Sequence, residues 1–168
     1  MSTVIGLKIE FVDIPPSHSN SVEYVTNLKE KMVITHEINK LLSQNVIVKC
    51  EPEKGQVTSP IFLREKSDNT HRLILNLKSL NKDVVYKHFK MDTISTILNL
   101  VDTDCFMTKI DIKSAYYSIK IHKVFRKFLK FYQDGSLYKF RCMPNGLTSG
   151  PRVFTKLMKP VLAFLRGL

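Results

Sequence analysis

The sequence has few of the features that mark several common protein classes. It contains only six glycines among 168 residues and no Gly-x-x-x-x-Gly-Lys pattern, which excludes a P-loop nucleotide site. No apolar run reaches the roughly 18 residues that a membrane-spanning helix needs. The first residues lack a basic region followed by a long apolar stretch, so we expect no secretory signal. These absences predict an intracellular protein, cytoplasmic or nuclear, with no membrane segment.

Cysteine and histidine are too sparse and too scattered to predict a metal cluster. The three cysteines, Cys50, Cys105 and Cys142, are widely spaced and lie beside apolar or basic residues. The five histidines show no ligand spacing. We therefore expect buried free thiols in a reducing compartment rather than a disulfide framework.

Acidic residues are scarce in the second half of the chain. The whole sequence has 26 Lys and Arg against 15 Asp and Glu, which gives a net charge of +11. Residues 109–130 contain Asp111 as their only acid, and no acid follows Gly135. A basic field attracts polyanions and speeds their encounter. A nucleic-acid partner is therefore favoured over a solvated basic surface that has no partner.

The pattern of apolar residues predicts a single α+β domain that is large enough to bury a core. Alternating residues predict strands, apolar residues at helical spacing predict helices, and Asp134-Gly135 is a strong hairpin turn signal. The expected elements are a strand at 6–12, a helix at about 27–43, a strand at 45–48, a hairpin of 59–64 and 72–77, a short helix capped by Asp92, a strand ending at Asp111, a hairpin of 127–132 and 137–140, and a helix from Ser149 or Gly150 to the end.

Asp111 is the first candidate for chemistry. The apolar, β-prone run 107–112 delivers this carboxylate to the end of a predicted strand. Mg²⁺ takes oxygen ligands and is usually held by one or two carboxylates together with substrate phosphates, so Asp111 is a candidate metal ligand. The alternative role for such a carboxylate is to cap the helical turn that follows.

Two further segments carry candidate binding groups. Lys66 lies in the charged turn of the 59–77 hairpin, with Arg72 just after it, and the planar fork of an arginine suits phosphate oxygens. A solvated hairpin tip is the alternative. Asn145 follows Pro144 in a tight turn, where its amide either contacts a base or sugar or belongs to a plain loop. Aromatic residues interleaved with lysines at 116–132 suit base stacking, although core packing is expected for most of them.

Three sequence blocks stand out in order along the chain: 59–63 with 72–81, then 109–117, then 143–147 with 151–154. In this order they resemble the blocks of reverse transcriptases, the RNA-directed DNA polymerases of retroelements, and they are most similar to those of retrotransposon enzymes. The similarity extends from about Ile34 to Leu168. The blocks are 59–63 with 72–81, similar to the family's fingers hairpin; 109–117, similar to the first catalytic-aspartate motif of the palm; and 143–147 with 151–154, similar to the Pro-x-Gly block and its following helix.

The resemblance implies a fold and a division of the chain. The fold would be the fingers and the first half of the palm of a right-hand polymerase, with an incomplete palm sheet. The division would be an N-terminal arm at 1–30, a fingers-like region at 31–90 and a partial palm at 91–168.

The resemblance also implies roles for individual residues. Asp111 would ligate a catalytic Mg²⁺, and the backbone of Ile112 would supply a further oxygen. Nucleotide-binding roles fall on Lys66, Arg72, Ser114, Ala115, Tyr116 and Asn145. The implied substrates are an RNA or DNA template–primer and a dNTP, and the implied mechanism is two-metal phosphoryl transfer.

The sequence departs from the family pattern in several places. Asn76 and Ser114 stand where many relatives have Asp, and Asn145 stands where Phe is common. The family's Tyr-x-Asp-Asp hairpin is expected after the helix at 150–167, but the sequence contains no adjacent pair of Asp residues. We therefore expect a truncated domain that is inactive alone, with an exposed edge on the Asp111 strand. The alternative is a non-catalytic, nucleic-acid-binding remnant of a retroelement.

Overall fold

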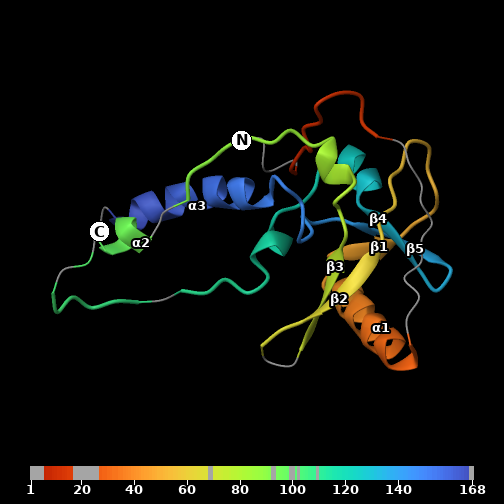
Figure 1. The fold of residues 1–168 in the computed structure, drawn as a ribbon, viewed down its shortest axis with the longest axis horizontal. Coiled ribbons are helices and arrows are strands. Elements are labelled where there is room, and N and C mark those ends of the chain that lie inside the picture. Colours follow the sequence, from red (N-terminus) through yellow and green to blue (C-terminus); the bar gives the residue numbers. More distant parts are fainter. Residues whose placement is uncertain are drawn as a thin grey trace.

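The computed structural model describes residues 6–16, 27–67, 70–91, 94–98, 101, 103–108 and 110–166 (Figure 1). It contains both helices and small antiparallel sheets, which confirms the predicted α+β class. The elements are α1 (Leu28–Ser43), β1 (Ile47–Lys49), β2 (Ile61–Glu65), β3 (His71–Leu75), the 3₁₀ helix η2 (Leu80–Lys82), α2 (Ile94–Leu98), the 3₁₀ helices η3 (Ala115–Ser118) and η4 (Lys123–Phe128), β4 (Lys130–Gln133), β5 (Ser136–Phe140) and α3 (Gly150–Arg166).

Helix α1 confirms the helix predicted at 27–43. The side chain of Asn27 accepts a hydrogen bond from the backbone N–H of Glu30 at 2.9 Å, which satisfies one of the free donors at the start of the helix. Ile34, Ile38 and Leu41 follow at helical spacing and are all buried. This apolar stripe fixes α1 against β1 and β3.

The larger sheet has the strand order β1-β5-β4, and all neighbouring strands are antiparallel. Strands β4 and β5 form the predicted hairpin, in which Gln133 is opposite Ser136. The first strand was predicted to begin at Lys127, but Lys127 and Phe128 belong to η4 and the strand begins at Lys130. The two loop residues, Asp134 and Gly135, have φ angles of 49° and 67°. Positive φ at both positions is typical of a type I′ turn, which Asp-Gly favours. The hairpin places β5 in the middle of the sheet.

The smaller sheet is the predicted hairpin of β2 and β3, in which Ile61 is opposite Leu75 and Arg64 is opposite Arg72. Leu75 is buried at the base of the hairpin, whereas Arg64 and Arg72 near its tip are exposed. Figure 1 shows the hairpin extending from the body beside α1. This arrangement holds the Lys66 turn away from the core.

One lysine is fully buried, which the sequence pattern did not predict. Lys130 has an exposed fraction of 0%, and its Nζ atom contacts Glu53 Oε1 at 2.8 Å, Gln56 Oε1 at 2.8 Å and the carbonyl oxygen of Glu51 at 3.0 Å. The hydrogen bond from Lys130 holds the pKa of Glu53 below its ordinary value. These contacts fasten the 51–56 loop to β4.

Two predicted strands were wrong. Residues 6–12 make only isolated bridges, Leu7 with Ile121 and Phe11 with Val84, although Ile9 is buried as the alternation predicted. Residues 103–108 and 110–112, before and including Asp111, contain no strand. In the described part of the chain neither segment has a neighbouring strand with which it forms a continuous ladder of hydrogen bonds.

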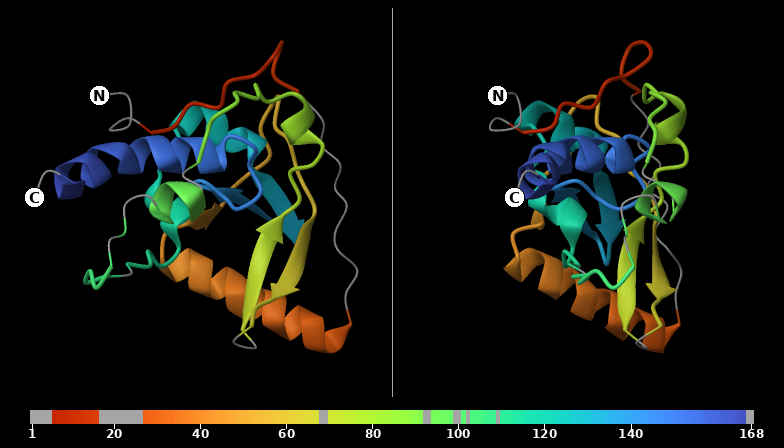
Figure 2. Two further views of the ribbon diagram at one scale, coloured as in Figure 1. Left: turned by 60° about the vertical axis from the view of Figure 1, so that its left-hand side comes forward. Right: turned by 90° about the vertical axis from the view of Figure 1, so that its left-hand side faces the viewer.

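Several of the exposed apolar residues lie on two elements that extend from the body (Figures 1 and 2). The loop before Asp111 exposes Phe106, Met107 and Ile110, and the second half of α3 exposes Val161 and Phe164. An exposed apolar segment was predicted here, but it is a loop rather than a strand edge. Helix α3 itself begins at Gly150, as predicted. No helix among the described residues has both the length and the apolar character needed to cross a membrane.

The cysteines agree with the prediction only in part. All three are free, and Cys142 is buried and Cys50 is half-buried. Burial raises the pKa of both of these thiols above their ordinary value, so they stay protonated at neutral pH. The prediction of a buried thiol was wrong for Cys105, which is exposed on the 103–108 loop. The predicted Asp92 cap lies outside the described residues.

Candidate functional site

A pocket of about 790 Å³ lies between the tip of the β2–β3 hairpin, the 111–117 segment and the end of α1. Residues predicted from the three separate sequence blocks line this one pocket. They are Lys66, Arg72, Asp111, Ile112, Ser114, Ala115, Tyr116 and Asn145. The folded chain therefore brings the whole set of predicted site residues together, and their individual roles stay predictions.

The segment that carries Asp111 turns sharply at Ser114. Ser114 has φ 54° and ψ 40°, a left-handed conformation that is uncommon for a residue other than glycine. Its carbonyl oxygen accepts a hydrogen bond from the backbone N–H of Tyr117 at 2.8 Å, which starts η3. Asp111 and Ser114 are exposed at the pocket, so a loop and a strained turn present this carboxylate where a strand end was predicted.

Tyr116 forms one wall of the pocket together with helix α3. Its ring lies 5.8 Å from the ring of Phe154, at an interplanar angle of 68°. This edge-to-face geometry is favourable for two aromatic rings. Gly150 lies beneath the Tyr116 ring, and a Cβ atom there would be in van der Waals contact with Tyr116 Cε2 at 3.7 Å. Helix α3 therefore supports the Tyr116 side chain from behind.

The turn that carries Asn145 is fastened by Asn81, a residue distant in sequence. The side-chain amide of Asn81 donates to the carbonyl oxygen of Gly146 at 2.8 Å and accepts from the backbone N–H of Thr148 at 3.0 Å. Gly146 has φ 99°, and a Cβ atom there would lie 3.2 Å from the carbonyl oxygen of Leu75. The turn is therefore pressed against the end of β3, and this position requires glycine.

Tyr117 positions the Asn145 amide from the other side. Asn145 Nδ2 donates to the hydroxyl oxygen of Tyr117 across 3.4 Å. Burial raises the pKa of Tyr117 above its ordinary value, and the nearby charge of Arg72 opposes that shift only in part. The hydroxyl is therefore neutral at physiological pH and accepts the amide hydrogen bond. The sequence marked Tyr117 only as an interleaved aromatic residue, because its contact with Asn145 depends on the fold.

The pocket is strongly positive. Its lining includes the cations Lys40, Lys66, Arg72 and Lys113, with Asp111 as the acid. Lys40 also forms an ion pair with Glu37, whose Oε1 atom lies 3.0 Å from Lys40 Nζ. Cations that converge on one open pocket favour an anionic ligand such as a phosphate group. No sequence signal marks Lys40 or Gln44 as pocket residues, because only the fold brings the end of α1 to the hairpin.

The carboxylate oxygens of Asp111 have the right chemistry for a hard divalent cation. However, no group of three or more His, Cys, Asp or Glu side chains lies close enough to hold a metal ion within the described ranges. The described residues therefore provide part of a ligand set and not a complete two-metal centre, which needs several carboxylates.

A second cleft of about 490 Å³ adjoins the pocket along the β2–β3 hairpin. It shares Lys66, Arg72 and Asn145 with the first pocket and adds the apolar side chains of Phe62 and Ile74. An apolar surface thus adjoins the cationic one. A ligand with an anionic group and a flat apolar group fits this combination better than a simple anion does.

Solved structures share this fold, which is the fingers and adjoining palm of a polymerase. A crystal structure of prototype foamy virus protease–reverse transcriptase matches with a TM-score of 0.74 and 22% sequence identity. The matched region covers 92% of this chain and 20% of the foamy virus chain. A structure of the foamy viral protease–reverse transcriptase in complex with dsDNA has a TM-score of 0.70 and 23% identity, covering 93% and 34% of the two chains. The predicted fold is confirmed.

The chain belongs to the reverse transcriptase (RNA-dependent DNA polymerase) family, whose family model matches residues 63–167. This family generally uses a divalent metal ion. The retrovirus-related Pol polyprotein from transposon gypsy of Drosophila melanogaster is 25% identical over 167 residues, which are 96% of this chain and 16% of the polyprotein. The transposon Tf2-3 polyprotein of Schizosaccharomyces pombe is 27% identical over 126 residues, 75% of this chain and 9% of that protein. The chain thus spans only a small part of the length of these curated relatives.

Proposed function

We propose that the pocket binds the triphosphate of an incoming dNTP and forms the nucleotide-binding part of a reverse transcriptase site. The observation that supports this proposal is the convergence of Lys66, Arg72 and Lys113 with Asp111 at one pocket. Lys66 and the fork of Arg72 bind phosphate oxygens from the hairpin side. Lys66 is half-buried and Arg72 is exposed, and both are charged donors that suit phosphate oxygens.

The remaining pocket residues follow the shape of a nucleotide. Ser114 and Ala115 lie along the phosphates, and the ring of Tyr116 lies beneath the sugar, where it excludes a 2′-hydroxyl. Asn145, held by Tyr117 and by the Asn81-fastened turn, contacts the nucleotide. Asp111 and the backbone oxygen of Ile112 would hold Mg²⁺, which supplies charge neutralisation to the phosphates when it is bound.

The wider proposal places this pocket in an intracellular polymerase that extends a primer along an RNA or DNA template. One of the solved relatives is described in complex with dsDNA, which supports a nucleic-acid partner for this fold. The division into an arm at 1–30, fingers at 31–90 and palm at 91–168 belongs to this proposal. Strand β1 pairs with β5, so the proposed fingers and palm share one sheet.

Equilibrium binding of a fluorescent dNTP in the presence of Mg²⁺ tests the proposal. The double variant Lys66→Gln/Arg72→Gln is expected to raise the Kd at least tenfold, because each lost charge-assisted hydrogen bond contributes about 1.5–3 kcal/mol. The matched control is Lys29→Gln/Lys82→Gln, which removes two exposed lysines that line neither pocket. Equal affinities for the two double variants would contradict the proposal.

Primer extension gives a second test. The 168 residues by themselves are expected to incorporate no nucleotide above the level of an Asp111→Ala variant. Two-metal phosphoryl transfer needs carboxylates from several positions to fix both ions, and among the described residues Asp111 is the one that lines the pocket. Incorporation by the unmodified chain that Asp111→Ala abolishes would show that the pocket is a complete catalytic site.

A non-catalytic nucleic-acid-binding module is the second candidate function. It is favoured by the net charge of +11 and by exposed lysines, such as Lys120 and Lys123, that line neither pocket. Filter binding across a range of salt concentrations separates the two candidates. Nucleic-acid affinity that falls steeply with salt, together with no dNTP binding at any Mg²⁺ concentration, would favour the module.

A further inference from the structure

Most of the basic residues between 109 and 130 do not take part in the pocket. Lys113 lines the pocket, and Lys130 is buried against Glu53. Lys127 lies with its Nζ atom 5.2 Å from the centroid of the Phe128 ring. Lys120 and Lys123 are exposed and Arg126 is half-buried, and the proposed nucleotide site gives these three cations no role.

The fold adds cations from two other segments to these three. The backbone N–H of Leu7 donates to the carbonyl oxygen of Lys120 at 2.7 Å, which brings the exposed Lys8 alongside. The backbone N–H of Ile121 donates to the carbonyl oxygen of Arg141 at 2.8 Å, and Lys120 forms a bridge with Cys142. We call the resulting set the rear basic surface; it consists of Lys8, Lys120, Lys123, Arg126 and Arg141.

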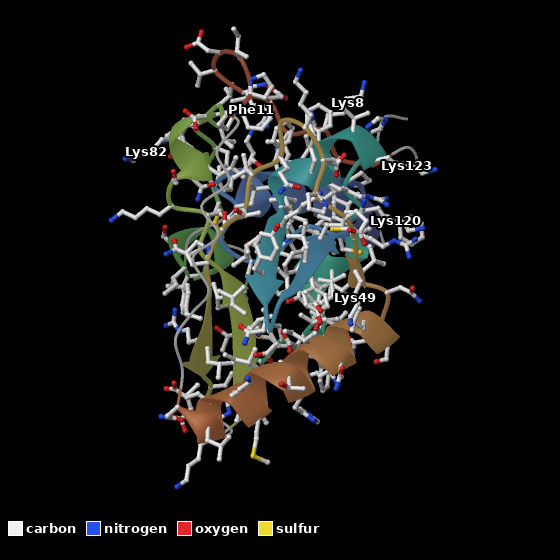
Figure 3. All side chains as sticks on the ribbon, turned by 90° about the vertical axis from the view of Figure 1, so that its right-hand side faces the viewer. Lys8, Phe11, Lys49, Lys82, Lys120 and Lys123 are labelled. Atoms are coloured by element: carbon white, nitrogen blue, oxygen red, sulfur yellow. The ribbon has the colours of Figure 1, made fainter. Side chains whose placement is uncertain are left out.

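The rear basic surface lies apart from the nucleotide pocket. Figure 3 shows Lys8, Lys120 and Lys123 at one edge of the molecule, on the side away from the β2–β3 hairpin. None of the five residues lines either pocket described above. A ligand on this surface therefore occupies a different place from a nucleotide held by Lys66 and Arg72.

No carboxylate neutralises this surface in the part of the chain that the structure describes. None of the ion pairs formed there includes any of its five residues. Two acids on neighbouring segments are engaged elsewhere, because Glu10 pairs with Lys87 and Glu53 pairs with Lys130. The cations of the surface consequently retain their full charge toward an external ligand.

The two arginines are also held in place. Arg126 Nε donates to the carbonyl oxygen of Ile121 at 2.8 Å, and Arg141 Nη1 donates to Asn45 Oδ1 at 3.3 Å. Burial, and then the neighbouring charge of Arg141, lower the pKa of Arg126. Like charges held close together raise the free energy of the unliganded protein, and a phosphate between them removes that repulsion. Guanidinium forks fixed in this way are prepared for phosphate oxygens.

We propose that the rear basic surface binds the phosphate backbone of a nucleic acid as a contact separate from the nucleotide pocket. A nucleic-acid backbone presents repeated negative charges that match cations spread over three chain segments. Such contacts position a strand without reading its sequence. The surface would thus hold a stretch of template or product that lies outside the reaction site.

The test measures the binding of the 168-residue chain to a labelled DNA duplex and a labelled single-stranded RNA at several salt concentrations. The variant Lys8→Gln/Lys120→Gln/Lys123→Gln changes only exposed side chains of the surface. It is expected to weaken binding at least tenfold at low salt. It should also reduce the slope of log K against log salt on the duplex by about two to three, since each lost phosphate contact contributes about 0.9. Its affinity for a dNTP should equal that of the unmodified chain.

The matched control, Lys29→Gln/Lys54→Gln/Lys82→Gln, removes the same three charges from exposed positions outside the surface. It is expected to bind both probes within about twofold of the unmodified chain, with the same salt slope. Equal losses in the two triple variants would show a general effect of net charge and overturn the proposal, as would unchanged binding by the surface variant. Loss of dNTP binding in Lys66→Gln/Arg72→Gln with intact duplex binding would separate the two sites.

Discussion

Replacing Lys130 by methionine is expected to lower the free energy of unfolding by about 2–3 kcal/mol. Methionine retains the apolar stem, but it removes the ammonium group that contacts Glu53, Gln56 and the Glu51 carbonyl oxygen. The loss is smaller than for a fully buried ion pair, because the Glu53 side chain is 46% exposed and can turn to water. Urea denaturation at neutral pH measures this difference.

Lys139→Met is the matched control for this substitution. Lys139 lies directly opposite Lys130 on β5, but it is only half-buried and takes part in no ion pair among the described residues. Its replacement should change the free energy of unfolding by less than about 0.5 kcal/mol. Similar values for Lys130→Met and Lys139→Met would show that the buried contacts of Lys130 add little to stability.

Lowering the pH should remove part of the contribution that Lys130 makes to the free energy of unfolding. The pKa of Glu53 in the folded protein lies below its ordinary value of 4.5. The ionised Glu53 therefore stabilises the fold above about pH 4.5, and this contribution is lost as the pH falls through the lower, folded value. The difference in stability between the unmodified chain and Lys130→Met should accordingly be smaller at pH 3.5 than at pH 7. A difference that stays constant over this range would contradict the role of the Glu53 carboxylate.

Gly146→Ala is expected to cost about 2–3 kcal/mol of stability and to weaken dNTP binding at the same time. The φ angle of 99° disfavours any residue with a Cβ atom, and this Cβ would lie 3.2 Å from the Leu75 carbonyl oxygen. The turn must shift to relieve that close contact, and the shift breaks the hydrogen bond from the Asn81 side chain to the Gly146 carbonyl oxygen. Asn145 then loses its place in the pocket. Denaturation and dNTP titration of the same variant measure the two effects.

Gly135→Ala is the control that separates the cost of a positive φ angle from the cost of the close contact at Gly146. Gly135 also has a positive φ, 67°, but a Cβ atom there would meet nothing within 4 Å. We expect this variant to lose only about 1 kcal/mol and to bind dNTP normally. If Gly146→Ala bound dNTP as tightly as Gly135→Ala, the turn at Asn145 would have no role in nucleotide binding.

The sequence predicted the elements whose signals are local. Helix α1 begins beside a capping asparagine, and the β4–β5 turn uses Asp134-Gly135, so each boundary is encoded by a few adjacent residues. The strand predicted to end at Asp111 was wrong because apolar, β-prone residues give a segment the propensity to form a strand but do not supply the second segment with which it must pair. A strand also needs a neighbour, and within the described ranges the residues before Asp111 have none.

The same distinction applies to the candidate site. Local sequence signals selected Lys66, Arg72 and Asp111 one by one, the family resemblance gave each a role, and the fold places all of them at one pocket. The residues that support the site could not be found in this way. Asn81 acts on a turn 65 residues away, and the approach of Lys40 depends on how α1 packs beside the hairpin. Neither contact leaves a periodic or spaced signal in the sequence.

Mapping a bound dNTP onto the chain by NMR tests the central claim most directly. Backbone amide resonances are followed while dNTP and Mg²⁺ are added to the isotope-labelled 168-residue chain. The proposed site predicts that the largest shifts fall on the hairpin tip around Lys66 and Arg72, on Ser114–Tyr116 and on Asn145, with the rear basic surface unchanged. Shifts confined to Lys120 and Arg141, or no shifts at millimolar nucleotide, would contradict a nucleotide pocket at this place.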